Sequence, residues 1–186
     1  ALSAQKELLH AVSGERIREE LVRLLCGRSA ASVLSSYLDV LAAVIPELLP
    51  MKGFEQKSPH HIYDVWEHTL AVVRSIPPTS HLRLAALLHD IGKPDCFTED
   101  ANGIGHFYQH DRLGAETARR ILRRLKFDNE TTLRVVTLVR EHGRQIEPSA
   151  KAVKRVLRRF GPEIFFDLIA LKRADAAGQS PAFAFR

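Results

Sequence analysis

Apolar residues recur at helical spacing along almost the whole chain, and no segment shows the sustained alternation of a half-buried strand. Cap residues and breakers such as Ser13, Gly27 and Pro162 mark where helices should begin and end. The predicted helices cover about residues 14–26, 29–45, 62–75, 81–90, 111–125, 129–142, 150–160 and 162–177. The pattern therefore predicts an all-α fold, an irregular helical bundle with one long loop over residues 94–109.

Size and composition agree with an ordinary globular protein. The chain has 186 residues, of which 45% are hydrophobic and 26% charged, enough for one domain with a small helical annex. The longest apolar runs, residues 40–46 and 84–88, are too short to cross a bilayer, and charges interrupt the first 30 residues where a signal peptide would lie. Cys26 and Cys96 form no CxxC pair. We therefore expect a cytoplasmic protein with no membrane partner.

Positive charge is concentrated in one part of the chain. The net charge is +5, but residues 110–160 alone hold 14 Lys and Arg against 6 Asp and Glu. This stretch is either a solvated basic face or a binding surface for phosphate-rich ligands, above all RNA. No aromatic ladder interleaves these charges, so the stretch does not predict a stacking platform for single strands.

The dipeptide His89-Asp90 closes the apolar run of residues 84–88 and precedes Gly92-Lys93. A carboxylate and an imidazole delivered by an apolar helix are costly to bury unless a divalent cation neutralises the charge there. The same dipeptide is also expected where an aspartate caps a helix and the histidine packs in the core. The pair alone therefore does not distinguish a metal site from a helix cap.

Other residues strengthen the metal interpretation. His68 lies near the edge of a buried helical stripe, and Asp175 follows Leu171 and Leu168 at helical spacing, which directs its carboxylate inward. His110 opens one predicted helix and His142 closes the next. Each of these, taken singly, is also compatible with a capped or surface residue.

Together these residues resemble a known family. The order His68, His89-Asp90, His110, His142, Asp175 is similar to that of HD-domain metal-dependent phosphohydrolases, and closest to the HD-bearing tRNA nucleotidyltransferases (CCA-adding enzymes and bacterial poly(A) polymerases). The strings at residues 60–69 and 89–94 carry the likeness most specifically, and it extends over about residues 10–180.

The resemblance implies a neck-like helical segment over residues 1–50, an HD domain over 51–180 and a tail at 181–186. The chain differs from the family in one respect. The family's nucleotide-transferring head needs an Asp-x-Asp pair, and this chain has none. We therefore expect no nucleotidyltransferase activity from this chain alone. The start at Ala1 and the apolar end are expected for a piece of a longer protein, although a processed standalone chain would look the same.

The resemblance also implies a ligand set. His68, His89, Asp90 and Asp175 would hold one divalent metal, and His110 and His142 would add a second ion with Asp90 bridging. Mixed imidazole and carboxylate ligands favour Mn²⁺, Fe²⁺, Co²⁺, Ni²⁺ or Zn²⁺, with Mg²⁺ still a candidate. Such a site would lower the pKa of a bound water to about 7 and supply hydroxide for attack on phosphorus.

Lys93 is the best candidate for a catalytic cation beside Asp90, or else a solvated loop lysine, and Arg144 and Arg173 are further candidates for phosphate contact. The leading hypothesis is a metal-dependent phosphomonoesterase or phosphodiesterase acting on phosphate esters or nucleotides, including 2′,3′-cyclic phosphates. The alternative is a neck-and-body fragment of a CCA-adding enzyme that binds tRNA through residues 110–160 without catalysis of its own. The sequence leaves the natural substrate, the metal count and the oligomeric state open.

Overall fold

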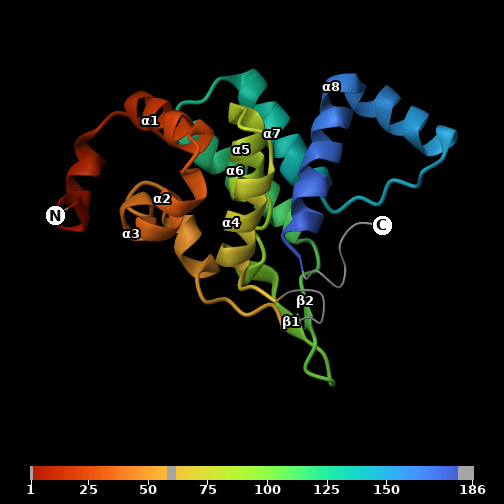
Figure 1. Cartoon of the computed structure of the whole chain (residues 1–186), viewed down its shortest axis with the longest axis horizontal. Coiled ribbons are helices and arrows are strands. Elements are labelled where there is room, and N and C mark those ends of the chain that lie inside the picture. Colours follow the sequence, from red (N-terminus) through yellow and green to blue (C-terminus); the bar gives the residue numbers. More distant parts are fainter. Residues whose placement is uncertain (1, 58–61, 180–186) are drawn as a thin grey trace.

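The computed structural model describes residues 2–57 and 62–179, and this part of the chain is an all-α bundle with one very small β-hairpin (Figure 1). The helices are η1 (Leu2–Ala11), α1 (Gly14–Cys26), α2 (Ala30–Ser36), α3 (Leu38–Leu41), η2 (Pro46–Met51), α4 (Val65–Ser75), α5 (Ser80–Leu88), η3 (Pro94–Cys96), α6 (His110–Arg124), α7 (Asn129–Glu141) and α8 (Ala150–Ala177). The hairpin strands are β1 (Thr98–Glu99) and β2 (Gly105–His106). The predicted fold class is confirmed. His60, His61 and the predicted tail at 181–186 lie outside the described residues.

Helix α5 forms the centre of the bundle. Every residue from Leu82 to Leu88 is buried, and all but Arg83 are apolar, as expected for a central helix. It packs against α1, α4, α7 and α8, so four other helices surround it (Figure 1). Because α5 ends in the interior, the residues that follow it, His89 and Asp90, are delivered into the core.

Side-chain caps fix several helix starts. Ser13, Asp128 and Ser149 each accept a hydrogen bond from a backbone N–H three residues ahead, as their positions in the sequence predict. Helix α4 begins at Val65, three residues later than expected, because the Asp64 side chain caps it by accepting from the Glu67 N–H at 2.7 Å.

Two local features differ from the sequence prediction, and a third agrees with it. The single helix expected over residues 29–45 is broken at Tyr37, and the break allows Leu38 and Leu41 to be buried. The long loop contains the hairpin, whose strands are too short for any alternation to reveal. The two helices expected at the C-terminal end are confirmed, because Gly161 has a non-helical backbone with a φ of 82° and divides α8 at the bend that Figure 1 shows.

Among the described helices, none combines the length and the apolar character that crossing a membrane requires.

Candidate metal centre

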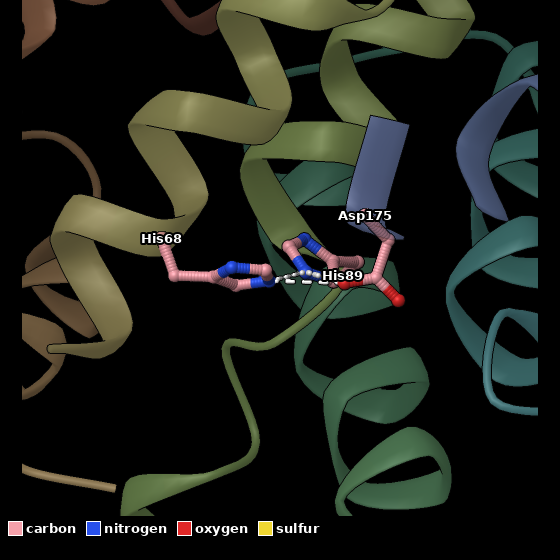
Figure 2. A group of neighbouring side chains, drawn as sticks. All are labelled: His68, His89 and Asp175. Carbon is pink, nitrogen blue, oxygen red and sulfur yellow. Dashed lines mark hydrogen bonds and ion pairs between the residues drawn. The ribbon is translucent and has the colours of Figure 1, made fainter. Parts of the chain in front are cut away.

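Six side chains from five helices meet at one end of α5. His68 lies within α4, His89 caps α5 at its C-terminus and Asp90 follows it directly. The other three are His110, the first residue of α6, His142, the C-cap of α7, and Asp175, near the end of α8. Figure 2 shows His68, His89 and Asp175 pointing toward one another. The structure thus brings together all six residues that sequence reasoning grouped, while their role as ligands stays a prediction.

The four imidazole rings share one hydrogen-bonding pattern. In each ring, Nδ1 lies within hydrogen-bond distance of a backbone carbonyl oxygen. The pairs are His68 with Gly178 at 3.1 Å, His89 with Ala86 at 2.8 Å, His110 with Phe107 at 2.7 Å and His142 with Val139 at 2.6 Å. A carbonyl oxygen only accepts, so Nδ1 must carry the proton in every ring. In the neutral ring Nε2 is then left without a proton and could serve as a ligand atom, held in place as metal-binding histidines usually are.

The Nε2 atoms face each other in two pairs. His68 Nε2 lies 3.2 Å from His89 Nε2, and His110 Nε2 lies 3.2 Å from His142 Nε2. Two unprotonated nitrogens repel each other at this separation unless a proton or another cation lies between them. The arrangement is therefore matched to a positive ion at each pair.

Asp90 lies between the two pairs and offers one oxygen to each. Its Oδ2 is 3.2 Å from His89 Nε2 and 3.5 Å from His68 Nε2, while its Oδ1 is 3.7 Å from both His110 Nε2 and His142 Nε2. The carboxylate is only 2% exposed, and the cation that faces its Oδ2 is the Lys93 ammonium, 2.8 Å away. A buried carboxylate is costly without such positive charge beside it.

Asp175 completes the first pair, with its Oδ1 3.0 Å from His68 Nε2 and 4.0 Å from His89 Nε2. Two groups of ligand atoms result, each within 4.8 Å: His68, His89 and Asp175 in one, and Asp90, His110 and His142 in the other. Both groups mix imidazole nitrogen with carboxylate oxygen, a donor set that suits first-row divalent metals. The residues present therefore fit one or two such ions.

Charge and burial act in opposite directions on the pKa values in the site. Burial alone would raise the pKa of Asp90, but the neighbouring charges of His89 and Lys93 outweigh it and hold the pKa well below its ordinary value. Burial likewise opposes protonation of His68, yet its hydrogen bond to Asp175 and the charge of Asp90 raise its pKa. At His110 burial dominates and lowers the pKa. The carboxylates thus stay ionised at neutral pH, as ligands must be.

Lys93 is buried rather than solvated, with 6% of its surface exposed. Its Nζ donates to Gln56 Oε1 at 2.6 Å and forms an ion pair with Asp90 Oδ2 at 2.8 Å. The ammonium group also lies 5.3 Å from the centre of the Phe107 ring. This geometry makes Lys93 a fixed positive charge against Asp90.

A cavity of about 350 Å³ opens over this centre and is lined by Asp90, Lys93, His110, His142 and Asp175, among others. A second cavity borders it at Gly143, and Arg144 lines this one while forming an ion pair with Glu141. Arg173 is exposed and lines neither cavity, because it is two residues from Asp175 and so projects from the opposite side of α8.

Sequence reasoning missed two partners of the site. Gln56 is 2% exposed and holds Lys93, and the Lys172 Nζ donates to the His142 carbonyl oxygen at 2.7 Å. Neither is signalled by a helical pattern, since one lies in a loop and the other on a partly exposed helix position.

Gly92 sets the distance between the Asp90 loop and α6. A Cβ atom added at Gly92 would lie 2.4 Å from the His110 carbonyl oxygen and 2.6 Å from the Gly114 nitrogen, both backbone atoms that cannot swing away. We expect Gly92→Ala to lower the free energy of unfolding by at least about 2 kcal/mol, because α6 must shift outward. Denaturant unfolding measures this change.

Gly143→Ala is the matched control, since a Cβ at Gly143 meets nothing within 4 Å. Equal stability of the Gly92 and Gly143 variants would show that the close approach of α6 is not required.

Comparison with known protein families gives two matches. Residues 60–177 match the family model described as HD domain. Residues 1–51 match the model described as probable RNA and SrmB-binding site of polymerase A.

Several curated proteins are similar over most of this chain. A CC-adding tRNA nucleotidyltransferase from Thermus thermophilus is 39% identical over 94% of this chain and 41% of its own length. An A-adding tRNA nucleotidyltransferase from Deinococcus radiodurans is 36% identical over 87% of this chain and 38% of its own length. A multifunctional CCA protein from an Azoarcus species is 34% identical over 74% of this chain and 34% of its own length. The chain therefore spans about two fifths or less of the length of these relatives.

Proposed function

The chain belongs to the HD domain family, and from this membership we propose that it is a metal-dependent phosphohydrolase acting on phosphate esters, including 2′,3′-cyclic nucleotides. One observation carries the proposal. Two pairs of facing Nε2 atoms, each 3.2 Å apart, have Asp90 between them with one oxygen toward each pair. This arrangement favours a centre for positive ions at the floor of an open cavity.

We propose that His68, His89 and Asp175 would hold one ion and that Asp90, His110 and His142 would hold another. A divalent metal supplies a Lewis acid for the phosphate and lowers the pKa of a water to about 7. The backbone carbonyls that fix Nδ1 of each ring keep the ligand nitrogens aimed at the centre before any substrate arrives. The chain's own contribution is thus preorganisation of the site.

Lys93 is proposed as a catalytic residue that neutralises charge on the phosphate. Its ammonium group has three N–H bonds, of which one is used by Gln56 and one faces Asp90, and the residue lines the cavity. We propose that the third N–H contacts a phosphate oxygen. The described residues that line this cavity include no serine or cysteine, which favours attack by water over a covalent seryl or cysteinyl intermediate.

The proposal is tested by hydrolysis of bis-p-nitrophenyl phosphate and 2′,3′-cyclic AMP by the purified chain in the presence of Mn²⁺ or Ni²⁺. We expect turnover that disappears on chelation and returns on adding metal. Rates no higher than those of the metal salt alone, with every ion tried, would contradict the proposal.

A second function, RNA binding, is supported by separate observations. The segment at residues 1–51 matches an RNA-binding model, and the first half of α8 lines a cavity of about 490 Å³ with five cations and no acidic residue. These cations are Lys151, Lys154, Arg155, Arg158 and Arg159. We propose that this surface, together with the segment at 1–51, contacts tRNA. We do not assign nucleotide transfer to this chain, because it has no Asp-x-Asp pair.

A further inference from the structure

An aromatic pair stands at the side of the metal cavity. The rings of His106 and Tyr108 are stacked, with an interplanar angle of 8° and centres 5.4 Å apart. Tyr108 is 69% exposed, the highest exposure among the large apolar side chains described. Because one face of Tyr108 rests on His106, the exposure belongs largely to its other face and edges. A flat aromatic surface is therefore open to a ligand.

The hairpin holds this pair in place. His106 Nε2 lies 3.1 Å from Asp100 Oδ2, and Asp100 also accepts the backbone N–H groups of Asn102 and Ile104. The strand pairing joins His106 to Thr98, and the ion pair of Lys57 with Glu99 ties the hairpin to the preceding loop. The ring on which Tyr108 rests is thus fixed by the turn.

Both rings belong to the same cavity as the metal centre. His106 and Tyr108 line it together with Asp90, Lys93 and His110. Phe107, between them in sequence, lines the cavity as well and packs against Lys93 and Phe97. One short segment thus presents a half-buried ring to the Lys93 ammonium and an exposed ring to the ligand space.

We propose that the exposed face of Tyr108 stacks on the nucleobase of the substrate, so that the site selects nucleotides over phosphate esters that carry no base. This inference rests on the proposed function and names its substrate class. A phosphate at the Asp90 centre and a base on Tyr108 would share one cavity of about 350 Å³. Stacking on an aromatic side chain tolerates any base, because every base has a π-face, so the four bases should be accepted alike.

The first test compares substrates with and without a base. Tyr108→Ala should raise KM for 2′,3′-cyclic AMP by about tenfold or more while leaving hydrolysis of glycerol 1,2-cyclic phosphate unchanged. Tyr108→Phe should behave as the wild type, and Ile104→Ala, an exposed residue of the same hairpin that does not line the cavity, is the control. If Tyr108→Ala slows both substrates equally, or neither, the inference is wrong.

The second test measures the binding of a fluorescent nucleotide and does not depend on hydrolysis. The fluorescence of 2-aminopurine riboside 5′-monophosphate is quenched when its base stacks, and we expect quenching by the wild type and by Tyr108→Phe. Tyr108→Leu, which covers His106 without an aromatic ring, should bind at least about tenfold more weakly. Equal binding by all variants, or none by the wild type, would overturn the inference. Binding that depends on Tyr108 without hydrolysis of any ester would instead keep the inference and refute the phosphohydrolase proposal.

Discussion

Replacing Asp90 with asparagine is expected to reduce hydrolysis of 2′,3′-cyclic AMP by at least about 100-fold. Asparagine has nearly the same shape, so the buried position is filled, but its side chain carries no charge and its nitrogen cannot act as a metal ligand. Each carboxylate oxygen of Asp90 faces a different histidine pair, so the change removes the bridge and weakens both halves of the centre. Steady-state kinetics with added Mn²⁺ measure the loss, and metal analysis of the same sample should show fewer bound ions.

Asp95→Asn is the matched control, because Asp95 is an exposed carboxylate five residues further along, in η3. It should keep the wild-type rate and metal content. A wild-type rate for the Asp90 variant, in a sample that unfolds at the wild-type temperature, would remove Asp90 from the mechanism.

Neutralising three cations on the first half of α8, with Lys154→Gln, Arg155→Gln and Arg158→Gln together, is expected to weaken tRNA binding by about tenfold or more at low salt. All three are exposed and line the cation-rich cavity. Each lost phosphate contact should also reduce the slope of log affinity against log salt by about one. Filter binding or fluorescence anisotropy across a salt series gives both quantities.

The control triple Lys154→Arg, Arg155→Lys and Arg158→Lys keeps the charge and should keep the affinity. Hydrolysis of 2′,3′-cyclic AMP should be equal in all three proteins, since none of these residues lines the metal cavity. If the neutral triple binds tRNA as the wild type does, with the same salt slope, this surface is not where RNA binds.

Charge counting alone does not single out the first half of α8 as the surface to test. The arginines of α6 are equally prominent in the sequence, but the Arg124 guanidinium donates to both carboxylate oxygens of Glu47 and to the Val44 carbonyl, so it links α6 to the neck-like segment. Arg120 is held by Thr117. A count of charges along a stretch does not reveal such partners, whether they are local, as for Arg120, or distant in sequence, as for Arg124.

The helices could be predicted well because their signals are local. Ser13, Asp128 and Ser149 cap the helices that follow them, and the apolar run before His89 corresponds to a helix buried on all sides. Features set by tertiary contacts could not be predicted, such as the break at Tyr37 and the two-residue strands of the hairpin. In both places, tertiary packing overrides the secondary structure that the local sequence favours.

The candidate site shows the same division. Residue order and the resemblance grouped the six side chains now found together, and helical spacing correctly directed Asp175 inward. The sequence could not show that Lys93 is buried against Gln56, because the two are 37 residues apart. Nor could it distinguish Arg144, beside the cavity, from Arg173, on the far side of α8, or reveal that Tyr108 stacks on His106.

The position of a bound metal tests the central claim most directly. In crystals of the chain grown with Mn²⁺, an anomalous difference map should show density between the Nε2 atoms of His68 and His89, between those of His110 and His142, or at both places. Density at one place would identify the side chains of that group as metal ligands, and density at both would identify all six. Saturating Mn²⁺, Ni²⁺ or Zn²⁺ that leaves both places without anomalous density would contradict it.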